Sequence, residues 1–297
     1  MAAAGGCARP ARPIVFAVVA DVHCADKDTA GGRYYRQGLV GLKKFVEYVN
    51  NEKPAFAIEL GDFIDGGPNA HAELERVLGV WAGLETQGYF VLGNHEFNGL
   101  SRNTVTEKLG LAKGYYDFSC GGRRFVVLDT QAAAICGGWD TESPQYKSAK
   151  AMLESLKQAG AANAKTHNGA IGSEQLAWLE ETLADANRKG QDAVVFGHAP
   201  LVPEGAGDIA WDAGDVRRVF ERAGCVRAYL CGHRHSGGYV RENGICYLTL
   251  PAMVDAPDGQ CWALIRMFED RMEVEGSGAA KTMNLFFNNG KVKRVGG

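Results

Sequence analysis

The chain has 297 residues, of which 46% are hydrophobic and 23% charged, a balance typical of a folded globular protein. Its formal net charge of -3 argues against nucleic-acid-binding proteins, whose domains are strongly basic. The first apolar run, 14–20, is too short to cross a membrane and lacks the order of a signal peptide. We therefore expect a cytoplasmic protein with neither a membrane nor a nucleic acid as its partner.

The eight cysteines are scattered along the chain and contain no Cys-x-x-Cys pair. Disulfide frameworks are typical of shorter secreted chains, so we expect reduced thiols here.

Strand and helix patterns alternate in the first third of the chain. The expected elements are a buried strand over 14–20, a helix over 37–50, a strand over 55–60, a helix over 72–84 and a strand over 88–92. This alternation predicts a largely parallel sheet with helices on its faces.

The second part of the chain is richer in predicted strands. The expected elements are a hairpin of 115–119 and 124–129 around Gly121-Gly122, helices over 145–158 and 173–188, and strands over 193–197, 227–231, 245–250 and 261–268. These strands predict a second sheet. Because no repeat or long linker divides the chain, we expect one domain over 14–284, between an N-terminal arm (1–13) and a C-terminal tail (285–297).

Five short polar clusters each follow the end of a predicted strand. They are Asp21-Val22-His23, Gly61-Asp62 with Asp65, Gly93-Asn94-His95-Glu96, Gly197-His198 and Gly232-His233-Arg234-His235. Each cluster alone is commonplace, but sites in open α/β sheets form beyond the carboxyl ends of the strands. All five in this position predict one convergent site.

The ligand types in these clusters suit a divalent metal of hard or borderline character. Carboxylates and neutral imidazoles bind Mn, Fe, Zn or Co, and there is no thiolate cluster for a softer metal. The spacing of Asp21 and His23 places both side chains on one side of an extended segment, where they can share an ion. His233 and His235 have the same spacing.

This ordered set of clusters resembles the calcineurin-like metallophosphoesterases over residues 14 to about 250. The resemblance implies an α/β fold, a four-layer α/β/β/α sandwich of two mixed sheets flanked by helices. It also implies a hydrolase in which two divalent ions activate a bridging hydroxide and clamp the phosphoryl oxygens. The implied ligands are Asp21, His23, Asp62 and His235 for one ion, and Asp62, Asn94, His198 and His233 for the other, with Asp62 as the bridge.

The same resemblance implies two residues that act without binding metal. His95 would be the catalytic histidine, which stabilises the transition state or protonates the leaving group. Asp65 would orient the imidazole of His95, although a turn residue before Gly66-Gly67 is the plainer interpretation.

A narrower resemblance is to the manganese-dependent ADP-ribose/CDP-alcohol diphosphatases. The segments that carry it are 32–36, 61–66, 93–97, 101–102, 168–171, 175–179, 235–239, 257–260 and 283–284. It implies manganese as the metal, with Fe, Zn, Co or Mg as alternatives. It also implies a small phosphorylated substrate, a nucleoside diphosphate linked to an alcohol or sugar. Vertebrate members often carry Gln where this chain has His23, a difference that bears on metal preference.

The candidates for substrate binding are Arg33, Tyr34, Tyr35, Arg36 and Arg102. Arginine can hold a second phosphate through two hydrogen bonds, and tyrosine can stack on a base. Packing of the tyrosines against the sheet and a solvated position for Arg36 are equally expected.

Three other functions fit parts of the pattern. A phosphomonoesterase or a cyclic-nucleotide phosphodiesterase would use the same metal site. A protein-binding scaffold that has lost catalysis would be expected to lose ligands, whereas every position is filled here. A nuclease is disfavoured by the acidic balance and by the lack of a basic stretch with interleaved aromatic residues.

Overall fold

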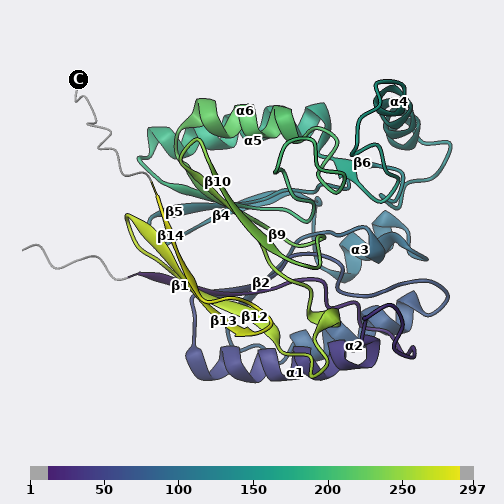
Figure 1. The fold of residues 1–297 in the computed structure, drawn as a ribbon, viewed down its shortest axis with the longest axis vertical. Coiled ribbons are helices and arrows are strands. Elements are labelled where there is room, and N and C mark those ends of the chain that lie inside the picture. Colours follow the sequence, from purple (N-terminus) through teal and green to yellow (C-terminus); the bar gives the residue numbers. More distant parts are fainter. Residues whose placement is uncertain (1–12, 288–297) are drawn as a thin grey trace, which may run out of the picture.

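Two six-stranded sheets pack face to face, with helices on both outer faces. The computed structural model describes residues 13–287. Helices α1 (Tyr35–Glu52) and α2 (Ala70–Trp81) cover the first sheet, and α5 (Gly172–Arg188) and α6 (Ala213–Ala223) cover the second (Figure 1). The expected four-layer sandwich of two mixed sheets is confirmed.

The first sheet has the order β14-β13-β12-β1-β2-β3 and the second β10-β11-β9-β8-β5-β4. The strands of the first are β1 (Ile14–Val19), β2 (Phe56–Glu59), β3 (Gln87–Phe90), β12 (Cys261–Met267), β13 (Arg271–Gly278) and β14 (Met283–Phe286). Those of the second are β4 (Tyr116–Cys120), β5 (Arg123–Val127), β8 (Ala193–Phe196), β9 (Val226–Cys231), β10 (Gly238–Glu242) and β11 (Ile245–Thr249). The remaining elements are α3 (Arg102–Lys108), α4 (Pro144–Gln158), the two-stranded pair β6 (Ala133–Ala134) and β7 (Gly169–Ala170), and the short 3-10 helices η1 (His95–Phe97) and η2 (Met253–Asp255).

The parallel strands explain why the polar clusters meet. Strands β1, β2 and β3 are parallel neighbours, as are β5, β8, β9 and β11 in the second sheet. Parallel strands leave their carboxyl ends at one edge of the sheet, so the loops that follow them gather there. In Figure 1 this edge lies on the right-hand side of the molecule.

Strand β1 shows how the continuous apolar runs are buried on both faces. Phe16 and Val18 join the core between the two sheets, whereas Ala17 and Val19 pack toward the helices. The ring of Phe16 stacks on that of Phe56 with centroids 4.9 Å apart. A strand covered on both faces needs no polar alternation, which is the pattern that the sequence displays.

Some elements were not predicted, although their sequences carry a signal. Helix α6 buries Val216, Val219 and Phe220, at helical spacing among charged residues. Strand β13 buries Met272 and Val274, which alternate with exposed or half-buried positions.

Strand β14 runs past residue 284, after which the C-terminal tail was predicted to begin. Leu285 is fully buried in β14, which pairs with β13 and closes the first sheet. A four-residue strand at the end of the chain gives too short a pattern to recognise. Residues 288–297 of the expected tail, and 1–12 of the expected arm, lie outside the described residues.

No helix within residues 13–287 is long and apolar enough to cross a membrane. The seven cysteines in the same range are all free thiols.

Replacing Leu285 by Ala is expected to lower the free energy of unfolding by about 2–5 kcal/mol, because it opens a cavity under β14. The matched control is Phe286→Ala on the same strand, since the Phe286 side chain is 48% exposed. That control should change stability by about 0.5 kcal/mol or less. Urea unfolding measures both, and equal losses would contradict the assignment of Leu285 to the core.

Candidate metal centre

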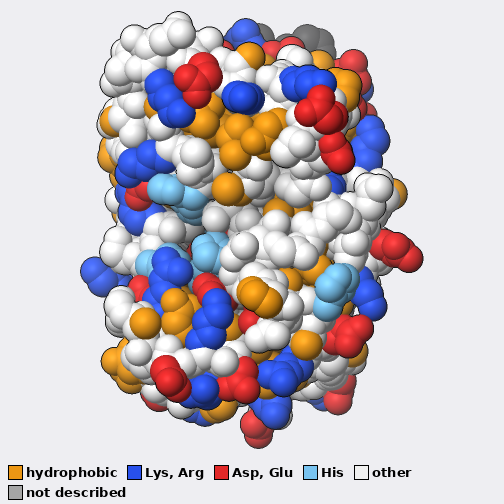
Figure 2. Space-filling model, turned by 90° about the vertical axis from the view of Figure 1, so that its right-hand side faces the viewer, with side chains coloured by type: hydrophobic (Ala, Val, Ile, Leu, Met, Phe, Trp, Pro, Cys, Tyr) orange, Lys and Arg blue, Asp and Glu red, His pale blue; other side chains and the backbone are white. Residues whose placement is uncertain are grey.

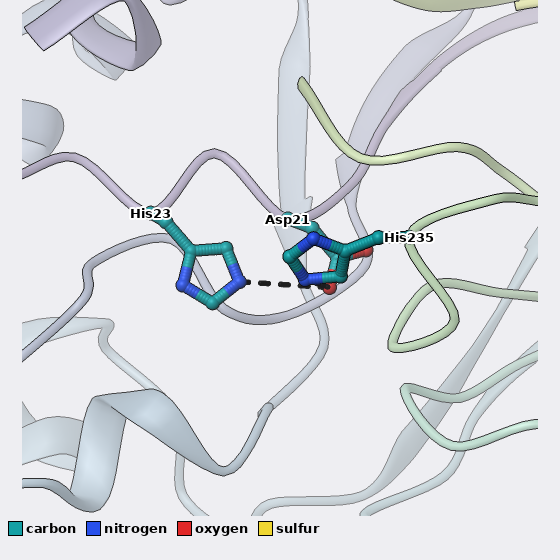
Figure 3. Close-up of side chains that lie close together, drawn as sticks. All are labelled: Asp21, His23 and His235. Carbon is teal, nitrogen blue, oxygen red and sulfur yellow. Dashed lines mark ion pairs between the residues drawn. The ribbon is translucent and has the colours of Figure 1, made fainter. Parts of the chain in front are cut away.

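Asp21, His23 and His235 form the first group of potential ligands. Oδ1 of Asp21 lies 3.9 Å from Nε2 of His23 and 3.8 Å from Nε2 of His235. Figure 3 shows the two imidazoles beside the Asp21 carboxylate, reaching it from separate segments of the chain. Both carboxylate oxygens of Asp21 also accept the backbone N–H of His233, which ties the loop after β9 to the loop after β1.

A second group of potential ligands surrounds Asp62. Oδ2 of Asp62 lies 3.5 Å from Nε2 of His23 and 3.2 Å from Nε2 of His198. Nδ1 of His233 is 3.2 Å from the same nitrogen of His198. Asn94 is buried, and its Oδ1 has no hydrogen-bond partner in the described chain. One oxygen of Asp62 therefore faces imidazoles of both groups.

The backbone at these positions corrects one expectation from the sequence. Asp21 and His23 do not share an extended segment: β1 ends at Val19, and both residues are left-handed, with φ of 53° and 41°. Asp62 and His233 are left-handed as well. Four of the six described non-glycine residues with positive φ are thus predicted ligands, and such strain concentrates at functional sites.

Two glycines leave the space that the carboxylates occupy. A Cβ on Gly93 would lie 2.2 Å from Oδ1 of Asp62, and a Cβ on Gly232 would lie 2.3 Å from Oδ2 of Asp21. Any side chain at either position would therefore displace a carboxylate from the site.

Three histidines have one ring nitrogen bonded to an acceptor outside the site. Nδ1 of His198 donates to the carbonyl of Leu60 at 2.8 Å, and Nδ1 of His235 donates to Asp255 at 3.1 Å. Nε2 of His233 donates to Oδ1 of Asn168 at 3.1 Å. Such partners fix the tautomer of a metal-binding histidine and leave the other nitrogen free as a ligand.

Asp255 and Asn168 are functional candidates that the sequence did not assign. Asn168 belongs to a segment with a family resemblance, yet nothing near it in sequence indicated a contact with His233. Asp255 lies 20 residues after His235, and its contact is made by the fold alone.

The charges of the site favour cations. Burial opposes the charged form of His198, but the charge of Asp62 and its hydrogen bond, together with the charge of Asp21 and the Leu60 carbonyl, raise its pKa to about 10. Burial also opposes charging of His23, but the carboxylates of Asp21, Asp65 and Asp62 together raise its pKa to about 9. Burial and the neighbouring charge of His198 lower the pKa of His233 to about 3. The carboxylates thus stabilise the protonated forms of His198 and His23, and a divalent ion would displace those protons.

His95 stands at the open side of these groups, with its side chain 25% exposed. Its Nδ1 is 2.9 Å from the backbone carbonyl of Asp65, which can only accept, so Nδ1 carries the proton. The Asp65 carboxylate lies farther away, 3.5 Å from the same nitrogen. Asp65 therefore does meet His95, but mainly through its backbone.

Glu96 holds the loops after β2 and β3 together. Its buried carboxylate accepts the backbone N–H groups of Asp62, Phe63 and Gly93. The sequence placed Glu96 in a polar cluster without a role, and the structure shows that it fixes the position of Asp62.

The donor set fits two divalent metals. The unpartnered Oδ1 of Asn94 and Nε2 of His23 are buried polar atoms that a bound cation would satisfy. Oxygen and imidazole donors without thiolates match metals of the Mn, Fe, Zn and Co type. Histidine side chains show on the face that carries this edge of the sheets, next to basic side chains (Figure 2).

A model of the calcineurin-like phosphoesterase family matches residues 14–237. The chain belongs to this family. Residues 14–237 contain the whole set of five polar clusters, so the family predicted from the sequence is confirmed.

The chain also resembles individual phosphoesterases along most of its length. The manganese-dependent ADP-ribose/CDP-alcohol diphosphatase of Xenopus tropicalis is 30% identical, over 94% of this chain and 95% of that protein. The enzyme of the same name from Homo sapiens is 29% identical, over 89% of this chain and 90% of that protein. A dimetal phosphatase from Danio rerio has a crystal structure that matches with a TM-score of 0.84 and 25% identity, over 93% of this chain and all of that one.

The predicted substrate residues of this phosphoesterase lie in different places. Arg33 is near the site, with Nη1 3.9 Å from Asp65. Tyr34 and Tyr35 are half-buried at the start of α1. Arg36 is exposed and pairs with two exposed aspartates, which leaves it a surface residue.

Arg102 is not available to a substrate. Its guanidinium donates to Asp129 and to the carbonyls of Gly137 and Gln131. It also lies against the rings of Phe97 and Trp139. The side chain is 7% exposed, so its charge is compensated inside the protein.

Arg102→Met is expected to cost about 3–5 kcal/mol of stability, because it leaves Asp129 buried without its partner. The matched control is Arg218→Met, which breaks an exposed pair with Asp215 and should cost about 1 kcal/mol at most. Urea unfolding gives the stability and kcat/KM of the folded enzyme gives the activity. A fall in kcat/KM with unchanged stability would restore Arg102 as a substrate residue.

Proposed function

We propose that this phosphoesterase hydrolyses nucleoside diphosphates linked to an alcohol or sugar, such as ADP-ribose and CDP-alcohols, with two divalent metal ions. The observation that carries the proposal is Asp62, whose single oxygen Oδ2 faces His23 and His198 from two sides. The substrate class is supported by the names of the relatives that match nearly the whole chain.

We assign the ligands from the two groups in the structure. Asp21, His23, His235 and Asp62 would hold one ion, and Asn94, His198, His233 and Asp62 the other. The relatives' names support manganese, and the donor types also admit Fe, Zn, Co or Mg. When bound, the ions supply Lewis acidity toward the phosphoryl oxygens and lower the pKa of water.

His95 is the proposed catalytic histidine. The carbonyl of Asp65 fixes its Nδ1, so the ring presents Nε2, which has no partner among the described residues. From that atom the ring would either donate a proton to the leaving oxygen or stabilise the transition state. Asp65 is a positioning residue, because it acts through His95.

The proposed partner is a small phosphorylated molecule, which would contact the residues at the open side of the metal centre. Arg33 is the arginine best placed for a phosphate beyond the attacked one, since it reaches Asp65 while its side chain stays 34% exposed. Tyr34 and Tyr35 flank it and keep either a packing or a stacking role. The free cysteines support a reducing compartment, and we propose the cytoplasm.

The substrate class is tested with chelated enzyme reconstituted with manganese. We expect the highest kcat/KM for ADP-ribose or CDP-choline, and lower values for p-nitrophenyl phosphate, bis(p-nitrophenyl) phosphate and cyclic AMP. Phosphate release from monoesters with the diphosphates untouched would instead identify a phosphomonoesterase. Cleavage of cyclic AMP alone would identify a cyclic-nucleotide phosphodiesterase.

Two substitutions separate metal binding from proton transfer. His95→Ala should retain both metals and lose turnover by about 10²–10⁴-fold. Asp62→Asn, of nearly the same shape, should lose metal because it removes the shared charge. Metal content by mass spectrometry and kcat on the best substrate check the pair. Parental turnover in His95→Ala, or parental metal content in Asp62→Asn, would refute the respective role.

A further inference from the structure

Positively charged and titratable side chains surround the Asp65 carboxylate at the edge of the metal centre. It is 7% exposed and contacts Lys27, and Nη1 of Arg33 lies 3.9 Å away. On its inner side, Oδ1 lies 3.3 Å from Nδ1 of His23 and 3.5 Å from Nδ1 of His95. One carboxylate thus separates the two permanent cations from a proposed ligand and from the proposed catalytic histidine.

Lys27 has hydrogen-bonding capacity that the protein does not use. Its ammonium has three donors, and Asp65 is the only hydrogen-bond acceptor it meets among residues 13–287. The side chain is 43% exposed, and the nitrogen lies 5.6 Å from the centre of the Tyr35 ring. Asp65 and Tyr35 therefore fix the position of an ammonium that still faces solvent.

The charges at this point favour an anion. Lys27 and Arg33 bring two positive charges to the single negative charge of Asp65, and the exposed carboxylates of Asp26 and Asp28 on the same loop are both paired with Arg36. A diphosphate whose one phosphorus is attacked at the metals carries its second phosphate one bridging oxygen away. The Asp65 carboxylate lies between Lys27 on one side and His23 and His95 on the other, and Lys27 is on the side open to solvent.

We propose that Lys27 binds the phosphate that is not attacked, and so selects diphosphates over substrates with a single phosphorus. The inference rests on the proposed function and adds a residue to its substrate site. Asp65 keeps one donor of Lys27 and the phosphate takes another, so no internal contact has to break. A lysine that serves only to neutralise Asp65 would affect all substrates alike, and this difference decides the test.

The test compares Lys27→Met with Lys43→Met, which removes the same charge from an exposed position on α1. The first readout is kcat/KM for ADP-ribose and for bis(p-nitrophenyl) phosphate, which has one phosphorus. The second is competitive inhibition of bis(p-nitrophenyl) phosphate hydrolysis by α,β-methylene-ADP, which the enzyme cannot cleave between its phosphates. A further variant, Lys27→Arg, keeps the charge.

We expect Lys27→Met to lower kcat/KM for ADP-ribose by about 10–100-fold, the range of a hydrogen bond to a charged group, through a higher KM. The inhibition constant of α,β-methylene-ADP should rise by a similar factor, while hydrolysis of bis(p-nitrophenyl) phosphate is retained. Lys43→Met should match the parent, and Lys27→Arg should recover most of the loss.

Two outcomes would overturn the inference. Equal losses on both substrates would show that Lys27 acts only through Asp65, and an unchanged inhibition constant would show that it does not meet the second phosphate. A parent enzyme that neither cleaves ADP-ribose nor binds α,β-methylene-ADP would instead refute the proposed function itself.

Discussion

The position of the Asp62 carboxylate is the constraint on which the site depends. Its backbone is left-handed, its N–H is held by Glu96, and Oδ1 accepts the backbone N–H of His95 at 2.8 Å. These contacts leave only Oδ2 to face the imidazoles. Gly93 is required beside it, because a Cβ would lie 2.2 Å from the other oxygen. The loops after β2 and β3 thus form one unit that presents a single negative oxygen.

The site also depends on the contact between the two sheets, because each sheet supplies some of the proposed ligands. Asp21, Asp62 and Asn94 follow strands of the first sheet, whereas His198 and His233 follow strands of the second. The aromatic core around Phe16 packs one sheet against the other and so fixes their relative position. Packing at a distance from the metal centre therefore sets the distances between the proposed ligands. The hydrogen bonds from the His233 backbone to Asp21 join the two sheets at the site itself.

Much of this arrangement was predictable because its signals are local. The apolar runs of β1 and β2 and the clusters that follow them can be read in a few consecutive residues, and parallel strands bring them together. What failed depends on distant contacts or on backbone shape. Asp255 and Asn168 meet their histidines only in the fold. The extended geometry assumed for Asp21 and His23 was wrong, because local spacing does not reveal a left-handed backbone.

The segment from Cys24 to Arg33 borders the metal centre but is less constrained by the fold. Most of it is exposed, and its backbone is tied down by few contacts, among them the bridges of Cys24 with Ile64 and of Ala30 with Arg33. Apart from Cys24 and Ala25, which are buried in the core, its residues enter neither the cores nor the proposed ligand set. Changes in its exposed residues would therefore leave the two cores and the proposed metal ligands in place. With the proposed role of Lys27, substrate preference can change through this loop while the proposed metal ligands stay the same.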